Sequence, residues 1–242
     1  SRGHNDSAGI HVDYNNENIL VQYNFTFNNE GYGTEILGAN KNIIWRYNIS
    51  VGDGTRVVNV PRPEGGRSIN PGRTIHVSDF AKPYRTKSED VFIYNNTYLV
   101  TSKSSPGIEL KAKNLFVWNN LFLVQDDAFL AKNFNKRSNS SSDIFVKNNG
   151  FSGMVSDEFI TLDEEPVFVN LDYEKIISNP KTFAFKKEKV STGNKTVKRN
   201  QPSFPSAGKG IFSHISEYPR KDFFENVIDY DMNVLGAGFS SN

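Results

Sequence analysis

Polar side chains that could do chemistry recur in short segments where apolar and polar residues alternate. His11 and His76 stand in the same context, Ile-His-Val, and Asp13 lies two residues after His11. Glu35 and Glu109 lie in the similar segments Thr-Glu-Ile and Ile-Glu-Leu. Alternation of this kind places apolar side chains on one face of an extended strand and polar ones on the other. We therefore expect one outward stripe of titratable groups, made by His11, Asp13, Glu35, His76, Glu109 and Lys111.

Two carboxyl groups in such a stripe could hydrolyse a glycosidic bond. Glycosidases use one protonated carboxyl as acid and one ionised carboxyl as base or nucleophile, separated by roughly 5 to 9.5 Å. Neighbouring strands supply this separation, because they lie about 4.8 Å apart. We predict Asp13 and Glu35 as the catalytic pair, with Glu30 and Asp53 in reserve. The alternative is that these carboxylates are ordinary solvated residues of an exposed sheet face.

The same stripe could support elimination from a uronic acid polymer. That reaction needs a base near the C5 proton and a cation, often Ca²⁺ or a basic side chain, that neutralises the substrate carboxylate. His11 or His76 could be the base, since the pKa of histidine lies near neutrality. Arg56, Arg67 or Arg73 could be the neutralising cation, with Ca²⁺ as an option and no residue assigned as its ligand. Each histidine could instead be a polar residue of the strand face that is bonded to a neighbour.

A Gly/Pro/Arg-rich segment, residues 52–73, should form a loop on the binding side. Its arginines are Arg56, Arg62, Arg67 and Arg73. Arginine binds carboxylate or sulfate through two parallel hydrogen bonds, so we expect the loop to roof the stripe over an anionic polysaccharide. The arginines could instead only neutralise Asp53 and Glu64. Tyrosines on bends beside the stripe could stack on sugar rings. The predicted substrate-binding residues are Arg56, Arg67, Arg73, Tyr14, Tyr32, Glu109 and Lys111.

A repeated nine-residue phrase predicts the elements that position these groups. It first reads Asn16-Glu-Asn-Ile-Leu-Val-Gln-Tyr-Asn24, and related copies begin at residues 40, 88, 112 and 141, at steps of 24, 48, 24 and 29 residues. A fixed period of this size indicates a solenoid. Its β-branched and aromatic residues make each copy a strand. The closing Asn suits a bend, because it can adopt a left-handed conformation, and its amide can form ladders from coil to coil.

A second, alternating strand precedes the phrase in several copies, so the chain should coil as strand, bend, strand, bend. We predict an all-β fold, a single-stranded right-handed parallel β-helix with an irregular C-terminal cap. Residues 1–155 should form the coils, and residues 156–242 should form the cap. The residues predicted to stack in the interior are Ile19, Val21, Ile43, Val91, Ile93, Leu115, Val117, Ile144 and Val146.

This architecture resembles the pectate-lyase-like β-helix superfamily of polysaccharide-active proteins. The tail is also similar to the ending of many bacterial secreted β-helix carbohydrate enzymes. The segments that carry this similarity are residues 165–170, 183–186, 204–210, 221–226 and 233–238. The chain departs from that ending at Glu225, where the pattern has Gly, and in the order of Pro205 and Ser206. The resemblance implies a secreted, cell-surface or periplasmic protein with a polysaccharide substrate.

Composition excludes several classes of partner and site for this protein. The 242 residues carry a formal net charge of +1, which argues against nucleic acid as the main partner. No apolar run is long enough to span a membrane. The absence of cysteine excludes disulfides and zinc-thiolate sites. Since the repeat begins at Gly9 without a capping element, we expect a preceding part of the chain or a second chain to complete the solenoid.

These observations predict a secreted polysaccharide-degrading enzyme, first of all a glycoside hydrolase acting on an anionic polysaccharide. A polysaccharide lyase is the second interpretation. The third is a non-catalytic glycan-binding module, such as an adhesin or a tailspike-like segment, which would need the aromatic side chains of the groove but not its carboxylates.

Overall fold

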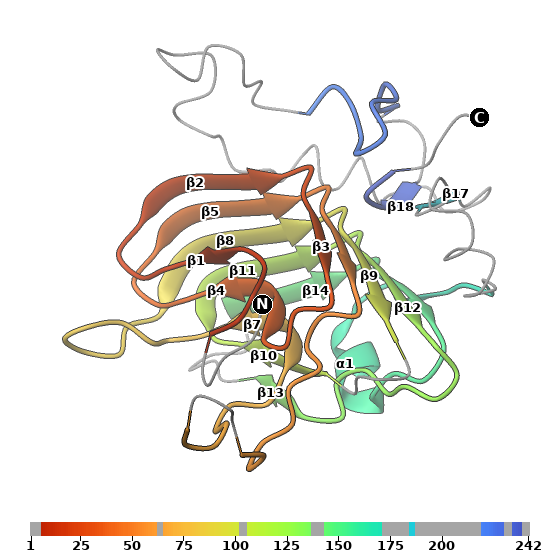
Figure 1. Ribbon diagram of the computed structural model, residues 1–242. Coiled ribbons are helices and arrows are strands. Elements are labelled where there is room, and N and C mark those ends of the chain that lie inside the picture. Colours follow the sequence, from red (N-terminus) through yellow and green to blue (C-terminus); the bar gives the residue numbers. More distant parts are fainter. Residues whose placement is uncertain are drawn as a thin grey trace.

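The computed structural model describes residues 6–61, 65–101, 106–136, 143–170, 184–186, 219–229 and 234–238. Within these residues the fold is mainly β, with three parallel sheets (Figure 1). Sheet A contains β1 (His11–Val12), β4 (Tyr32–Ile36), β7 (Arg73–Val77), β10 (Gly107–Leu110) and β13 (Phe134–Lys136). Sheet B contains β2 (Glu17–Gln22), β5 (Lys41–Arg46), β8 (Ser88–Tyr94), β11 (Ala112–Trp118) and β14 (Ile144–Lys147). Sheet C contains β3 (Phe25–Phe27), β6 (Ile49–Val51), β9 (Thr97–Val100), β12 (Leu121–Val124), β15 (Gly150–Ser152) and β16 (Val167–Phe168).

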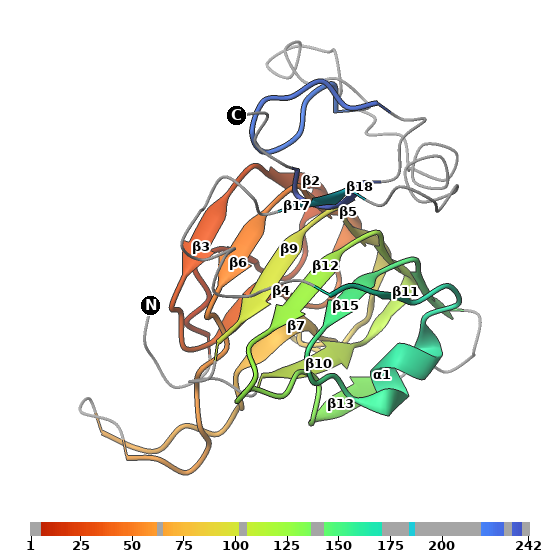
Figure 2. The ribbon, with the colours of Figure 1, turned by 90° about the vertical axis from the view of Figure 1, so that its right-hand side faces the viewer.

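The chain visits the three sheets in turn, so each passage adds one strand to A, then to B, then to C. Figure 2 shows sheet C from its outer side, with β3, β6, β9, β12 and β15 lying side by side. The sheets are open, and β1, β2 and β3 are edge strands. Residues 1–5 lie outside the described residues, so the expectation of a further chain at this end stays a prediction.

Equivalent positions of the sequence phrase pair with one another in sheet B. Ile43 lies between Ile19 and Val91, and Leu115 lies between Val91 and Ile144. The predicted interior residues all lie in parallel strands. Eight of the nine are buried, and Ile19 is partly buried against the same core. The period therefore identified both the strands and the face that packs inward.

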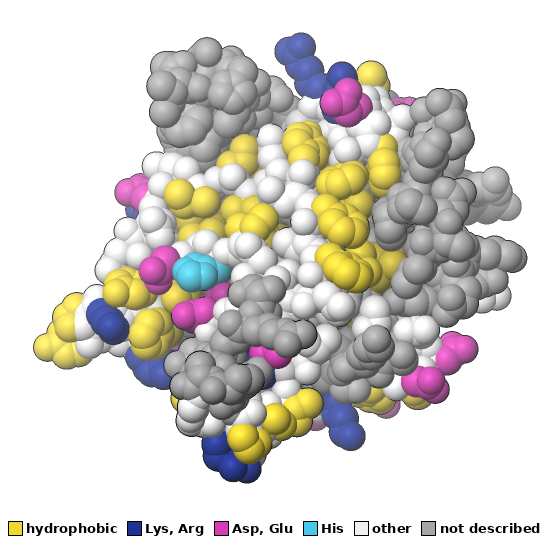
Figure 3. Space-filling model, viewed as in Figure 1, with side chains coloured by type: hydrophobic (Ala, Val, Ile, Leu, Met, Phe, Trp, Pro, Cys, Tyr) yellow, Lys and Arg dark blue, Asp and Glu magenta, His cyan; other side chains and the backbone are white. Residues whose placement is uncertain are grey.

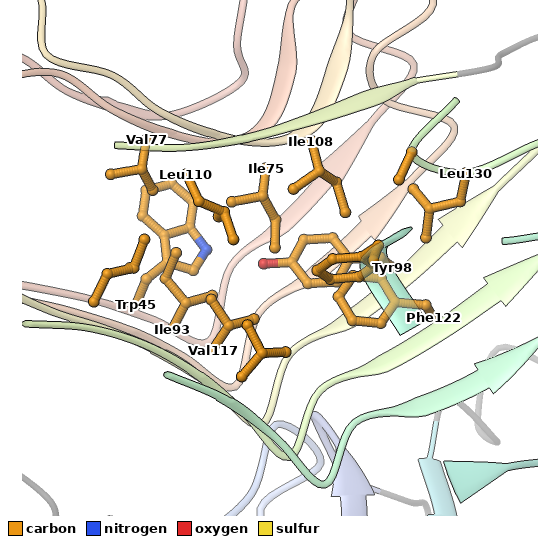
Figure 4. Close-up of a cluster of buried hydrophobic side chains, with 14 of the residues drawn as sticks. Trp45, Ile75, Val77, Ile93, Tyr98, Ile108, Leu110, Val117, Phe122 and Leu130 are labelled. Atoms are coloured by element: carbon orange, nitrogen blue, oxygen red, sulfur yellow. The ribbon is translucent and has the colours of Figure 1, made fainter. Parts of the chain in front are cut away.

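Side chains from all three sheets pack in one apolar core (Figure 4). Tyr98, Phe122 and Phe151 stack on one another within it, with ring centroids 5.1 and 5.5 Å apart. Trp45 is also in this core, whereas Trp118 lies on the other face of sheet B, beside Phe116. The two tryptophans occupy neighbouring register positions, and successive residues of a strand point to opposite faces. The core residues labelled in Figure 4 are Trp45, Ile75, Val77, Ile93, Tyr98, Ile108, Leu110, Val117, Phe122 and Leu130.

The predicted asparagine ladder connects sheets B and C. Each ladder Asn donates its side-chain Nδ2–H and its backbone N–H to the side-chain oxygen of the next, at 2.9–3.0 Å. Asp163 ends the ladder, because its carboxylate accepts from the backbone N–H and Nδ2 of the last Asn. The members in order are Asn24, Asn48, Asn96, Asn120, Asn149 and Asp163. The last four Asn side chains and Asp163 are buried, so the ladder satisfies polar groups that water does not reach.

The left-handed residue of each bend directly precedes the ladder Asn. Tyr47 has φ of 51°, and Asn95 and Asn119 have φ of 51° and 54°. Asparagine tolerates this region better than other non-glycine residues, and a tyrosine there is uncommon. The sequence analysis assigned both the left-handed conformation and the ladder hydrogen bonds to the same Asn. In the structure the ladder Asn forms the hydrogen bonds, and the residue before it has the left-handed conformation.

The described part of the tail contains a short helix and local turns. The helix α1 (Asp157–Leu162) follows sheet C, and β16 then pairs with β15, so parallel pairing extends past residue 155. Two further strands, β17 (Ala184–Lys186) and β18 (Val234–Gly236), pair antiparallel. The segment predicted at residues 204–210 lies outside the described residues. No helix in the described ranges has the length and hydropathy of a membrane span.

Glu225 lies in the left-handed region with φ of 65°, where the similar endings have Gly. The turn around it is held by Asp222, whose Oδ1 accepts hydrogen bonds from the backbone N–H of Phe224 and of Asn226. Gly238 packs directly on this carboxylate, since a Cβ there would come within 2.4 Å of it. A glycine would adopt this left-handed conformation without the strain that Glu225 carries.

We predict that Asn96→Ala destabilises the fold by roughly 3 kcal/mol or more, because it leaves several buried groups of the ladder without partners. Asn96 accepts from Asn48 and donates to Asn120, Trp45 and Tyr94. Urea unfolding should measure the loss. The control is Asn133→Ala at an exposed turn, expected to change stability by less than about 0.5 kcal/mol. Equal effects of the two substitutions would contradict a structural role of the ladder.

Candidate functional site

Four of the predicted stripe residues lie in register on adjacent strands of sheet A. His11 pairs with Glu35, Glu35 with His76, and His76 with Glu109. The row therefore alternates histidine and glutamate across β1, β4, β7 and β10. Figure 3 views this side of the molecule, where a histidine lies among acidic side chains, with basic and apolar side chains beside them.

A cavity of about 600 Å³ covers this row, within the usual size range of ligand sites. The predicted residues that line it are His11, Asp13, Tyr14, Tyr32, Glu35, Arg73, His76, Glu109 and Lys111. The lining residues that were not predicted are Asp6, Leu37, Ile69, Asn70, Ser78, Phe80, Lys82 and Arg85. Arg56 and Arg67 are absent from the lining.

Glu35 is a buried carboxyl at the base of the cavity. Its side chain is 1% exposed, and no described residue forms a hydrogen bond with its Oε2. Among the described residues, the basic atom within ion-pair distance is Nδ1 of His11, which lies 3.7 Å from this oxygen. Burial raises the pKa of Glu35 to about 8, and the carboxylates of Asp6 and Asp13 act in the same direction. Glu35 therefore carries a proton at neutral pH, unlike the solvated carboxylate considered as the alternative.

Asp13 provides a contrasting carboxyl, because it is exposed to solvent. Its Oδ1 accepts a hydrogen bond from the backbone N–H of Tyr14 at 2.8 Å. Since Val12 pairs with Ile36, Asp13 lies beside Leu37 and diagonally from Glu35. One strand spacing and two residues along the strand separate their Cα atoms by roughly 8 Å. Two carboxyls with environments that differ in this way suit separate roles as acid and as base or nucleophile.

Glu109 is surrounded by basic groups. Its Oε1 lies 2.5 Å from Nζ of Lys111, and its Oε2 lies 3.4 Å from Nη2 of Arg73 and 2.8 Å from Nδ1 of His76. Burial raises the pKa of Glu109, but His76, Arg73 and Lys111 together outweigh this effect and hold the pKa well below its usual range. Glu109 is thus an ionised group that is paired with the basic side chains around it, and its predicted contact with a substrate stays a prediction.

His76 is fixed in the middle of the row. Its ring stacks on Tyr32 at a centroid distance of 4.3 Å and an angle of 20°, and its Nδ1 faces Glu109. Burial lowers the pKa of His76, and the charges of Arg73 and Lys111 add to this effect against the opposing contact with Glu109. The imidazole is therefore neutral at neutral pH, with Nε2 on the ring edge away from Glu109.

Two predicted ligands have structural positions instead. Tyr32 is only 1% exposed, with His76 on its ring, so the prediction that it stacks on a sugar is wrong. Arg56 is buried, and it donates hydrogen bonds to the backbone carbonyls of Asn70 and Asp6 at 2.6 and 2.5 Å. Its guanidinium carbon also lies 5.1 Å from the Tyr32 ring centroid. Arg56 therefore ties the 52–73 segment to the start of the described chain.

The predicted roof is only partly formed by residues 52–73. Ile69, Asn70 and Arg73 line the cavity, whereas Arg67 is exposed outside it. Arg62 lies outside the described residues. Asp53, a reserve catalytic residue, is buried and accepts hydrogen bonds from Thr26, Asn29 and Ser50, so that reserve role is wrong.

The other wall of the cavity is the connection between β7 and β8, residues 78–87, which sequence reasoning missed. Ser78, Phe80, Lys82 and Arg85 of this connection line the cavity. The doubled spacing between the phrases at residues 40 and 88 was the available signal, but all of it was assigned to residues 52–73. Tyr14 packs against this wall, with its ring 5.9 Å from that of Phe80 in an edge-to-face arrangement. Tyr14 therefore lines the cavity, and its predicted stacking on a sugar ring stays a prediction.

No three His, Cys, Asp or Glu side chains of the described residues form a cluster that could hold a metal ion. A scan against models of known protein families gave no match, and a search of curated proteins found no similar sequence. The functional interpretation therefore depends on the geometry of the cavity.

We predict that Glu35→Gln alters how stability depends on pH. The pKa of Glu35 rises from 4.5 to about 8 on folding, so the native state binds a proton that the unfolded state loses within this window. Stability conferred by that proton is complete below about pH 4.5 and lost as pH rises through 8. The free energy of unfolding of the neutral Gln variant, relative to that of the wild type, should therefore rise by a few kcal/mol between pH 4.5 and 9. Urea unfolding across this pH range measures the difference.

The control for this prediction is Glu89→Gln. Contact with Lys113 lowers the pKa of this half-exposed carboxyl. The Glu89→Gln variant should therefore be slightly less stable than the wild type above pH 4.5. A wild type and Glu35→Gln variant with parallel pH profiles would show that Glu35 is not a buried acid.

Proposed function

We propose that the chain is a right-handed parallel β-helix of the pectate-lyase-like type and a secreted enzyme that hydrolyses an anionic polysaccharide in the sheet A cavity. The three parallel sheets, the 24-residue period and the asparagine ladder support the architecture. The observation that carries the activity is the pairing of the buried, protonated Glu35 with the exposed Asp13 in one cavity.

In this proposal Glu35 donates its proton to the glycosidic oxygen as the bond to the anomeric carbon breaks. Asp13 either attacks that carbon or takes a proton from the attacking water. In the first case water later releases the glycosyl group, and Glu35 takes the proton of that water. In the second case the proton of the water ends on Asp13 and that of Glu35 on the leaving sugar, so the site regains its starting state by exchange with solvent.

Basic side chains support an anionic substrate. Arg73, Lys82, Arg85 and Lys111 line the cavity, whereas its only carboxylates among the described residues are Asp6, Asp13, Glu35 and Glu109. Because Glu35 is protonated, these four cations stand against the three carboxylates of Asp6, Asp13 and Glu109, and this small excess of positive charge supports a negatively charged ligand.

A specific observation also favours elimination as a second candidate. His76 is neutral, is held by Tyr32 and Glu109, and lines the cavity, as a base for the C5 proton of a uronate would need to be. Glu35 could then protonate the departing oxygen. The cations nearest to His76, Arg73 and Lys111, are engaged by Glu109, which leaves them less suited to neutralise a substrate carboxylate.

We predict that Glu35→Gln and Asp13→Asn each lower kcat by roughly 10² to 10⁴-fold on the cleaved polysaccharide while binding of that glycan is retained. Wild-type activity should also fall as pH rises through about 8, where Glu35 loses its proton. Release of reducing ends from a panel of uronic and sulfated polysaccharides measures both effects. The control is Glu17→Gln, an exposed residue of β2.

Two outcomes would contradict this assignment. Activity that persists in both variants would place catalysis elsewhere. Glycan binding by the wild type without cleavage of any panel member would instead favour the non-catalytic module.

We further predict that the products carry no new double bond. Hydrolysis adds water across the bond that it breaks, whereas elimination leaves an unsaturated uronate that absorbs ultraviolet light. A rise in ultraviolet absorbance in step with chain cleavage, abolished in His76→Asn, would replace the hydrolase by the lyase. Cleavage without this rise is the expected result.

A further inference from the structure

The cations of the cavity differ in whether the protein already satisfies them. Arg73 and Lys111 are both within ion-pair distance of Glu109. Arg85 lies 2.8 Å from the carboxylate of Asp79, and Lys111 lies 3.7 Å from the same group. Lys82, by contrast, has no acidic partner among the described residues, although it lines the cavity. The other three basic side chains share their charge with a carboxylate of the protein, whereas Lys82 shares its charge with none of the described residues.

We infer that Lys82, near the tip of the connection between β7 and β8, is the residue that recognises the anionic group of the sugar. The ligand is a carboxylated or sulfated glycan, since both groups present oxygen atoms that accept from an ammonium. This inference rests on the proposed function for the choice of a glycan. It moves anion recognition from the arginines of residues 52–73 to the opposite wall.

The connection that carries Lys82 is held by hydrogen bonds at its base. The backbone N–H of Thr86 donates to the carbonyl of Asp79 at 2.9 Å, which closes residues 79–86 into a loop. Gly38 and Ala39, at the end of β4, donate to the carbonyls of Phe80 and Thr86 at 2.7 and 2.9 Å. These bonds fix the loop against the strand that carries Glu35.

Close packing also requires the glycine at this contact. A Cβ on Gly38 would come within 2.3 Å of the carbonyl oxygen of Thr86. The connection therefore lies directly on the backbone of the β4–β5 bend, and it projects at the left of the view in Figure 1.

An aromatic surface lies beside Lys82 within the same wall. Phe80 is 38% exposed, and its ring packs edge-to-face with Tyr14 from the end of β1. Sugar rings present apolar C–H faces that pack on aromatic side chains, while the charged substituent projects at their edge. Lys82 and these two rings thus offer both contacts that an acidic sugar needs, and a neutral sugar would use only the rings.

Binding measurements on Lys82→Gln test this inference without relying on cleavage. The probes are a short oligogalacturonate, dextran sulfate and neutral dextran, studied by affinity electrophoresis and calorimetry at two salt concentrations. We expect binding of one anionic probe to weaken by roughly tenfold in Lys82→Gln and to be restored in Lys82→Arg. The preferred anionic probe distinguishes a carboxylate from a sulfate ligand. Lys41→Gln, an exposed lysine of β5 outside the cavity, is the matched control and should bind as the wild type does.

Three results would overturn the inference: no binding of either anionic probe by the wild type, unchanged binding in Lys82→Gln, or equal weakening in Lys41→Gln. The last result would show that net charge alone attracts the probe. Failure of the proposed function can be told apart from failure of this inference. Lys82-dependent binding without cleavage would support anion recognition by Lys82 and contradict the hydrolase activity. Cleavage of a neutral glycan alone would support the hydrolase activity and contradict anion recognition by Lys82.

Discussion

The structure depends on one constraint, the parallel register that returns equivalent residues to the same height in every passage of the chain. Backbone hydrogen bonds supply most of it, and the side-chain ladder from Asn24 to Asp163 removes the remaining freedom to slip. A shift by one residue would bring apolar side chains outward and leave buried amides unpaired, so the alternative registers are strongly disfavoured. The same register aligns His11, Glu35 and His76 on the outer face of sheet A.

The side chains around each group in this row determine whether that group is charged at neutral pH. Glu35 and Glu109 occupy equivalent places on β4 and β10, yet one is protonated and the other ionised at neutral pH. The difference comes from their surroundings, because Glu109 is in contact with three basic side chains, whereas no basic side chain in the described part of the chain lies within hydrogen-bond distance of Glu35. An evenly spaced scaffold thus carries groups with opposite protonation states, which acid–base chemistry requires.

The sequence predicted the strands and the stripe well, because a visible period determines which side chains share a face. It could not predict the burial of Glu35, since that burial depends on which side chains line the cavity around it, and Asp6, one of them, lies ahead of the first repeated strand. The end of the ladder at Asp163 was equally hidden, because the period is lost before that residue. Lys82 was missed for a related reason. Its connection has no pattern of its own and shares one doubled interval with the more conspicuous arginine-rich segment.

Two long connections of the repeat flank the same strand. The segments before and after β7, residues 52–72 and 78–87, are longer than the corresponding connections around β4 and β10. All of their additional length lies outside the ladder, so it can vary without altering the register of any strand. The parallel sheets are therefore a rigid scaffold, and the two loops are the part of the site that can change. Exchange of these two loops would be the natural way to re-engineer the chain for a different ligand while the acid on β4 keeps its place.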